Sequence, residues 1–205
     1  MKLILLSKNI ERVKVLVPKN SALREYREKA LKMIGVPDKK ITEVRGEDIP
    51  FLLEEYKNKG KKAIGLTGED LFKEYTFSVR FTKVRVLKRI EWKDKKAMFG
   101  KPTLCLLGPK NSSLEGLPKE LKVCINYKYK LLAKRYLNFL ERKMGFNFRK
   151  IYTKGTTETT YSEGLSDLVI DIVYTGASIK KAGLRVYEKI FSSDFVILGG
   201  GDDKA

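Results

Sequence analysis

Short apolar runs alternate with amphipathic segments along most of the chain. Runs such as VKVLV (13–17), AIGL (63–66) and LVIDIVY (168–174) have the length and β-branched content of buried strands. Helical patterns lie between them, the clearest over 129–144, where apolar residues recur every three or four positions. Strands that alternate with helices predict α/β layers with parallel pairing.

The pattern starts afresh near residue 102, with the strand TLCLL (103–107). We therefore expect two α/β lobes with a ligand cleft between them. The first would span 1–101 and the second 102–201, followed by a short tail over 202–205.

Composition narrows the class of protein. With 205 residues, 42% hydrophobic and 33% charged, the chain can bury a sizeable core. No apolar run approaches the roughly 18 residues of a membrane span, and the apolar run near the amino terminus is short, so we expect a cytoplasmic protein. The chain has no histidine, which excludes Ser-His and Cys-His catalysis. Cys105 and Cys124 lie in apolar stretches, so we expect buried thiols and no protein-held metal.

The chain is strongly basic. Lys and Arg total 43 against 25 Asp and Glu, which gives a formal net charge of +18. Such a charge attracts anions, whether nucleic acid, a membrane surface or polyphosphate metabolites. On charge alone nucleic acid ranks first, with a solvated surface as the plain alternative.

The most informative stretch is DIVYTGASIKKAGL (171–184), where an apolar strand turns into a helix. The free N–H groups of Gly176, Ala177 and Ser178, with the Thr175 hydroxyl, favour an anion such as a phosphate. Asp171 and Asp167 would accept hydrogen bonds from sugar hydroxyls or hold Mg²⁺ through water. The alternative is an ordinary capped helix start.

Two further stretches carry polar residues at strand ends. Glu158 lies among small hydroxyl residues in KGTTETTYSEGLSD (154–167). Arg45 and Asp70 follow strands of the first lobe and could face the cleft from the other side. The alternatives are a solvated loop for the first stretch and helix-terminal residues for the second.

The order of these segments, from PKNSAL to EKIFSSDFVIL, resembles the short-form catalytic chain of the ATP phosphoribosyltransferases. The resemblance covers roughly residues 13–198 and is most specific over 155–184. The family pattern is matched there by Gly155, Glu158, Gly164, Leu165, Asp167, Asp171, Thr175, Gly176, Ser178, Gly183 and Leu184, with Ile179 in place of a leucine.

The resemblance implies two lobes arranged like a type II periplasmic binding protein, with substrates in the cleft. The reaction would transfer the phosphoribosyl group of phosphoribosyl pyrophosphate (PRPP) to N1 of ATP, the first step of histidine biosynthesis. Asp171 and Glu158 would be catalytic, and Asp167 with Thr175–Ser178 would bind PRPP. Lys19, Arg45 and Asp70 would lie on the ATP side.

The resemblance also implies partners. Mg²⁺ would arrive on the substrate pyrophosphate. A regulatory subunit resembling histidyl-tRNA synthetase and a homo-oligomer are expected, a membrane is not, and nucleic acid becomes an unlikely ligand. Two alternatives stay open: a phosphate-binding module of the same fold that has lost catalysis, and a nucleic-acid-binding protein. Turnover of ATP and PRPP would separate the first alternative from the enzyme, and a steep salt dependence of binding would reveal the second.

Overall fold

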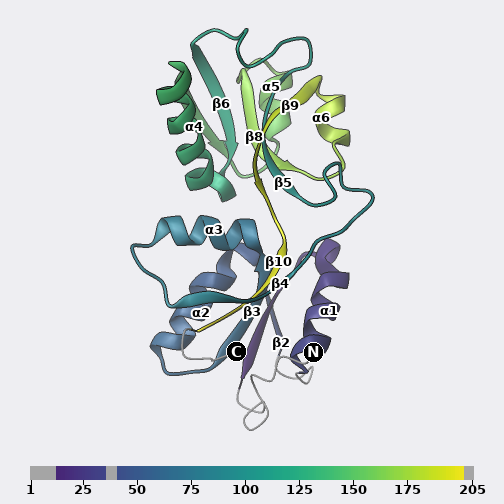
Figure 1. Ribbon diagram of the computed structural model, residues 1–205, viewed down its shortest axis with the longest axis vertical. Coiled ribbons are helices and arrows are strands. Elements are labelled where there is room, and N and C mark those ends of the chain that lie inside the picture. Colours follow the sequence, from purple (N-terminus) through teal and green to yellow (C-terminus); the bar gives the residue numbers. More distant parts are fainter. Residues whose placement is uncertain (1–12, 36–40, 201–205) are drawn as a thin grey trace. The chain divides into compact units, whose positions relative to one another are not determined.

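The structure is a computed structural model that describes residues 13–35 and 41–200, which fold into two compact units (Figure 1). The chain passes from the first unit to the second after Trp92 and returns after Ser193. This division differs from the expected boundary at 101/102. The last strand also differs, because it pairs within the first unit rather than the second.

The first unit is built on a mixed five-stranded sheet with the order β2-β1-β3-β10-β4. Its strands are β1 Lys14–Pro18, β2 Ile41–Val44, β3 Ala63–Gly68, β4 Val84–Ile90 and β10 Phe195–Gly200. β1 is parallel to β2 and to β3, whereas β10 runs antiparallel to both β3 and β4. All six residues of β3 are buried, as expected for a central strand.

Helices cover both faces of this sheet. They are α1 Arg24–Ile34, α2 Ile49–Asn58 and α3 Glu69–Ser78, with short 3-10 turns at Ser21–Leu23 and Gly46–Asp48. Ile49 and Leu53 of α2 pack against Leu16, Val196 and Leu198 on one face. Apolar residues one position along the strands face the other way, where the Tyr26 ring of α1 lies 6.2 Å from that of Phe195.

The second unit has its own five-stranded sheet, with the order β7-β6-β8-β5-β9. Its strands are β5 Thr103–Pro109, β6 Glu120–Asn126, β7 Asn147–Thr153, β8 Leu168–Val173 and β9 Leu184–Ser192. β6 is parallel to β7 and β8, and β5 is antiparallel to β8 and β9. Three neighbouring parallel strands therefore end at one edge.

Three helices complete the second unit. They are α4 Lys130–Met144, which follows a 3-10 turn at Tyr127–Tyr129, α5 Thr157–Ser162 and α6 Ala177–Lys181. α4 lies on one side of the sheet, and α5 and α6 lie on the other (Figure 1). The α5 and α6 side encloses an apolar cluster that includes Cys105, Cys124, Val169 and Ile179. Both cysteines are buried free thiols, as the sequence predicted.

Candidate functional site

Polar residues gather at the edge where the three parallel strands of the second unit end. β6 ends at Asn126, β7 leads into the Lys154–Thr157 loop, and β8 leads into the Tyr174–Ser178 loop. The carboxyl ends of parallel strands are where open α/β sheets bind ligands. The predicted residues Asp171, Glu158 and Thr175–Ser178 all belong to this edge.

Asp171 is the centre of a hydrogen-bond network. It shares its face of the sheet with Val169 and Val173, both of which belong to the apolar core. Its Oδ1 accepts hydrogen bonds from Asn126 Nδ2 at 3.0 Å and from the Ile172 amide at 2.7 Å. A carboxylate in such a position must be hydrogen-bonded, since an unpaired buried charge is costly.

Thr157 links the two carboxylates of the site. Its hydroxyl is fully buried, lies 2.6 Å from Asp171 Oδ2 and lies 3.2 Å from Glu158 Oε2. A hydroxyl has one proton, so the shorter contact is its principal donation. Thr156, directly before it, is the one described non-glycine residue with a positive φ, at 54°. Such a conformation costs on the order of 1–3 kcal/mol and is commonly found at functional sites.

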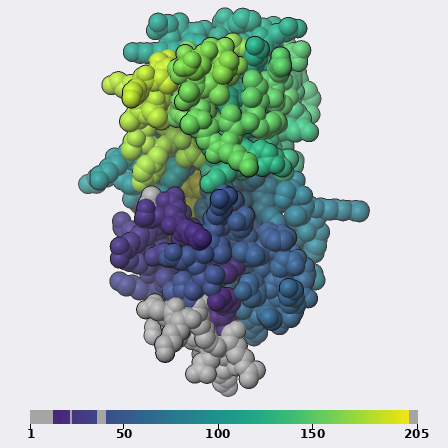
Figure 2. Space-filling view, turned by 180° about the vertical axis from the view of Figure 1, so that it is seen from behind, coloured from purple at the N-terminus to yellow at the C-terminus, as the bar shows by residue number. Residues whose placement is uncertain are grey.

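Glu158 joins this network to the Tyr174–Ser178 loop. Its Oε1 accepts a hydrogen bond of 2.8 Å from the Ser178 hydroxyl. The sequence thus brings Asp171 and Glu158 together through Thr157, with Ser178 bound to the second carboxylate. On the face of the unit seen in Figure 2, the green surface of α5 lies next to the yellow-green surface of α6.

Burial controls the ionisation of Asp171. Its removal from water raises the pKa of this carboxyl above the ordinary value, and the charge of Glu158 adds to the rise. The hydrogen bonds from Thr157, the Ile172 amide and Asn126 oppose it. The site therefore holds two neighbouring half-buried carboxylates, and the enclosure of Asp171 disfavours its charge.

The Tyr174–Ser178 loop has the conformation expected of an anion-binding turn. Gly176 adopts a left-handed conformation, with φ of 77°. Within the described residues, the main-chain N–H groups of Gly176 and Ser178 donate to no acceptor, and that of Ala177 makes a long contact of 3.4 Å with Thr175 Oγ1. These amides are therefore available to a ligand.

A neighbouring loop that the sequence did not single out supports this turn. The Met98 amide donates to the Tyr174 carbonyl at 2.7 Å, and the Tyr174 hydroxyl donates to Asp94 Oδ2. This hydroxyl, with the Lys96 amide, lowers the pKa of Asp94. Asn126 and Thr157 were also missed, because their importance lies in partners that are distant in the sequence.

Asp167 is not part of the network. Its carboxylate accepts a hydrogen bond of 2.7 Å from the Lys122 amide, near the start of β6, and its own amide donates to the Lys122 carbonyl. Asp167 lies four positions before Asp171, which is a distance of about 13 Å along an extended chain. The residue secures the opposite edge of the sheet, so its expected role in PRPP binding has no geometric support.

The predicted residues of the first unit meet at one edge of its own sheet. Lys19 follows β1, Arg45 follows β2, and Asp70 lies in the first turn of α3, directly after β3. These strands are parallel, so their carboxyl ends coincide. Lys19 and Arg45 are exposed, whereas Asp70 is only 6% exposed. The two cations can therefore meet an anion from solvent, and the carboxylate is largely enclosed.

The described residues contain no group of three or more His, Cys, Asp or Glu side chains arranged to hold a metal ion. None of the helices within 13–35 and 41–200 has both the length and the apolar character needed to cross a bilayer.

Comparison with known proteins identifies relatives by sequence. A family model described as HisG, ATP phosphoribosyltransferase, matches residues 45–202. The ATP phosphoribosyltransferase of Caldicellulosiruptor bescii is 32% identical over 142 residues, which are 69% of this chain and 60% of the relative. That of Methanococcus maripaludis is 31% identical over 160 residues, 77% of this chain and 49% of the relative. The chain thus spans 49–60% of the length of these curated relatives.

Comparison with solved structures supports the result of the sequence comparison. A chain of the ATP phosphoribosyl transferase (HisG:HisZ) complex from Thermotoga maritima superposes with a TM-score of 0.68 at 26% identity, covering 92% of this chain and 88% of that one. The periplasmic aliphatic sulphonate binding protein SsuA from Escherichia coli gives 0.58 at 16% identity, covering 94% and 66%. The predicted fold class, two α/β lobes like those of a type II periplasmic binding protein, is confirmed. The family model, the two sequence relatives and the fold together establish that the chain belongs to the ATP phosphoribosyltransferase (HisG) family.

Proposed function

We propose that this protein transfers the phosphoribosyl group of PRPP to N1 of ATP and releases pyrophosphate. The observation that carries the proposal is the network that joins Asn126, Asp171, Thr157, Glu158 and Ser178 beside a glycine turn with free amides. Family membership supports the same reaction. A catalytically impaired binding module and a nucleic-acid-binding protein are not favoured by these matches.

The 5′-phosphate of PRPP would bind at the Thr175–Ser178 turn. The free amides of Gly176 and Ser178 are suited to phosphate oxygens, and the Thr175 hydroxyl adds a donor. The Ser178 hydroxyl donates to Glu158 without ligand. It would turn to the phosphate on binding, which would leave Glu158 Oε1 open to another donor.

The ribose hydroxyls would supply that donor. Asp171 and Glu158 lie directly beside the phosphate turn, and both are carboxylates with acceptor capacity left. Thr157 would hold the two carboxylates at a fixed spacing. Asp167 is left out of the proposed site, because it secures the other edge of the sheet.

The reaction depends on the alignment of ATP and PRPP more than on proton transfer. The lone pair of adenine N1 forms a bond to C1 of the ribose, and the bond from C1 to the pyrophosphate oxygen breaks with its electron pair. No proton needs to leave N1 before the attack, so a chain without histidine is suited to the chemistry. The protein would contribute by orienting two substrates and by hydrogen-bonding developing charge.

Mg²⁺ would enter with the substrate and neutralise charge on the departing pyrophosphate. Asp171 and Glu158 are the carboxylates that the phosphate turn brings close, and together they fit sugar hydroxyls or water of a hydrated ion better than a closed metal cage. On the first unit, Lys19 and Arg45 would meet the triphosphate of ATP. The enclosed Asp70 would act by positioning its neighbours.

We further propose a second subunit. The similar Thermotoga maritima structure is described as a HisG:HisZ complex. The corresponding partner here would be a regulatory protein of the HisZ kind, resembling histidyl-tRNA synthetase, in a larger assembly that also contains more than one copy of this chain.

The test is an assay of phosphoribosyl-ATP formation from ATP and PRPP, with the chain alone and with a candidate HisZ-type subunit. We expect product in at least the second case, and its loss in Asp171→Ala. Thr82→Ala, a partly buried threonine of the first unit that binds Glu54, is a matched control and should leave product formation intact. PRPP binding without any turnover, under either condition, would contradict the proposed reaction.

A further inference from the structure

The first unit carries a pocket of about 310 Å³ at the edge of its sheet opposite to Lys19 and Arg45. It lies where β3 begins, β10 ends and β4 begins, because Ala63, Gly200 and Lys83 line it. The pocket is therefore separate from the site residues of the first unit, Lys19, Arg45 and Asp70.

Eight of the described residues line the pocket; four of these are lysines, namely Lys57, Lys61, Lys62 and Lys83, and none of the eight is acidic. Lys57 comes from the last turn of α2, and Lys61 and Lys62 from the tight turn that leads into β3. This turn is held by the Lys61 amide, which donates to the Tyr56 carbonyl at 2.9 Å. The main chain thus fixes where the cationic side chains start.

Three of the four charges are not neutralised by the described residues. In the part of the chain that the structure describes, Lys61, Lys62 and Lys83 form no ion pair. Glu54, one turn before Lys57 on α2, already accepts hydrogen bonds from the Thr82 hydroxyl and the Lys83 amide. Like charges held together repel one another, so a site of this kind gains from an anion.

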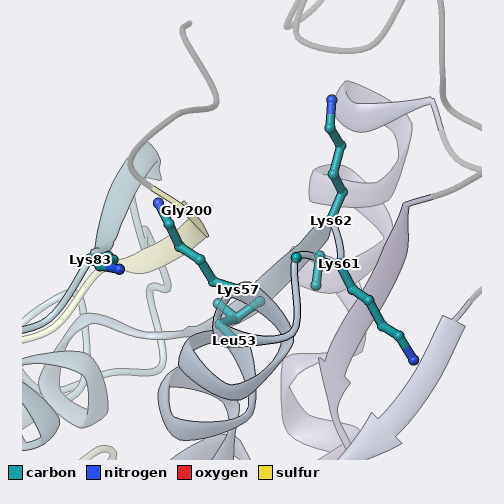
Figure 3. Close-up of a pocket in the computed structure, with 8 residues that line it drawn as sticks. Leu53, Lys57, Lys61, Lys62, Lys83 and Gly200 are labelled. Atoms are coloured by element: carbon teal, nitrogen blue, oxygen red, sulfur yellow. The ribbon is translucent and has the colours of Figure 1, made fainter.

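The arrangement of the side chains indicates an extended anion. Figure 3 shows Lys57 running toward Gly200, with Lys83 on that side, while Lys61 and Lys62 diverge on the other. A single phosphate could not reach all four ammonium groups. Leu53 and Ala63 supply the apolar part of the lining, and no aromatic side chain is present to stack on a base.

We propose that this pocket binds a small polyphosphate through its phosphate groups alone, without reading a base. Lysine is a point-charge ligand for phosphate, and several such charges suit a chain of two or three phosphates. The volume lies at the lower end of the range of about 300–1,000 Å³ for small-molecule pockets. Inorganic tripolyphosphate, pyrophosphate and the triphosphate of ATP share this chemistry.

Calorimetric titration with tripolyphosphate tests the proposal, with ribose 5-phosphate, which carries no diphosphate but would fill the phosphate turn, present at saturation in one series and absent in the other. We expect one saturable site in both series, weakened at least about tenfold in the triple variant Lys61→Ala, Lys62→Ala, Lys83→Ala, since each contact with phosphate is charge-assisted. All three lysines are exposed, so the variant should fold normally, which circular dichroism checks.

A control variant removes the same charge elsewhere on the first unit: Lys29→Ala, Lys32→Ala, Lys73→Ala, which are also exposed. It should bind tripolyphosphate within about threefold of wild type, as expected if screening by salt limits long-range effects. Equal losses in the two triple variants would overturn the site in favour of general charge attraction, and so would undiminished binding in the pocket variant. In a parallel titration with ATP, which also has the proposed substrate site at Lys19 and Arg45, the binding event that the pocket variant loses should have an affinity similar to that of tripolyphosphate. A much tighter lost event would overturn the claim that the base is not read.

Discussion

At the scale of single residues, the most informative position is Asp171, a carboxylate within an otherwise apolar strand. Its neighbours on the same face, Val169 and Val173, belong to the core, and its two oxygens accept three hydrogen bonds. Burial disfavours its charge, which the donors only partly offset. A carboxylate whose charge is disfavoured by burial in this way is a good candidate for a functional residue.

Asp171→Asn should therefore separate function from stability. The amide oxygen can keep the donors Asn126 and Ile172, and the Thr157 hydroxyl can turn toward Glu158 Oε2, 3.2 Å away. We expect the free energy of unfolding to stay within about 1 kcal/mol of the wild-type value, which corresponds to a few degrees in melting temperature. Most of the activity should be lost. A large loss of stability with normal turnover would assign the residue a structural role.

The difference in stability between wild type and Asp171→Asn should depend on pH. Because the folded-state pKa of Asp171 is raised, protonation favours the folded wild type, and this contribution is lost as pH rises through that pKa. The asparagine does not titrate. The stability of wild type relative to Asp171→Asn should thus fall as pH rises from about 4, the ordinary aspartate pKa, toward neutrality. Melting curves across this range measure the difference, and an opposite trend would contradict the raised pKa.

Gly176→Ala tests the phosphate turn. A Cβ there would meet Met98 Sδ at 3.0 Å on a backbone with φ of 77°, so the turn should deform and PRPP binding should be lost. Gly183→Ala is the matched control, with φ of 72° and open space around the new Cβ. Both variants should lose about 1–2 kcal/mol of stability from the left-handed conformation. Calorimetry should find that PRPP binding is retained only in Gly183→Ala. Equal affinities of the two variants for PRPP would contradict the assignment of the phosphate to this turn.

At the scale of elements, hydrogen bonds with one loop, residues 94–98, hold the Tyr174–Ser178 loop of the candidate site in place. The Tyr174 hydroxyl donates to Asp94, and the Met98 amide donates to the Tyr174 carbonyl. The segment between β4 and β5 is thereby attached to the phosphate turn. This attachment is local and only half-buried, so it should affect binding more than global stability.

Tyr174→Phe removes the side-chain part of this attachment. We expect a several-fold rise in the KM for PRPP with little change in melting temperature, and faster hydrogen exchange over residues 94–100. Since the folded-state pKa of Asp94 is lowered, its contribution is present above the unfolded pKa of about 3.9 and is lost as pH falls through the folded value. The exchange rates of variant and wild type should converge in acid. Identical exchange at neutral pH would show that the hydroxyl does not hold the loop.

Most elements could be predicted from the sequence because their signals are local. The apolar runs became β1, β3, β5 and β8, and the amphipathic stripe became α4. The helix α3 entered the sequence analysis only through the alternative that Asp70 is a helix-terminal residue, and Asp70 does lie in its first turn.

Pairing between distant strands was harder to predict, and so was the candidate site. Apolar content identified β10 as a strand, but not that it would join the first sheet. Both sheets are mixed, although parallel pairing was expected. Spacing placed Asp167 and Asp171 together on one strand. Only the strand direction shows that they lie at opposite edges of the sheet, and only the folded chain brings Thr157 and Asn126 to Asp171.

At the scale of the whole molecule, the two units depend differently on the end of the described chain. The second unit is contiguous, from Lys93 to Ser193, whereas the first combines residues up to Trp92 with a segment from Asp194 on. β10 is also an interior strand of the first sheet, between β3 and β4. Its residues Phe195, Val196, Ile197 and Leu198 are fully buried.

A chain that ends at Ser193 should therefore keep one unit and lose the other. Removal of β10 leaves β4 without its partner and exposes the core around Leu16 and Leu53. The four buried side chains of β10 alone stabilise the fold by about 6–12 kcal/mol, which is comparable to the 5–15 kcal/mol of a typical domain. Hydrogen exchange with mass spectrometry should find protection in β5, β6 and β8 and none in β1 and β3. Protection of β1 and β3 in this variant would show that the first sheet does not need its last strand.

The interior position of β10 in the first sheet also affects the order in which the two units can fold during synthesis. When the ribosome has made the first 92 residues, the strands β1 to β4 exist but the strand that joins β3 to β4 does not. The second unit is complete as soon as Ser193 has emerged, so the later half of the chain can reach its native state first. The nascent amino-terminal half meanwhile presents unpaired strand edges, which favours an early need for chaperones.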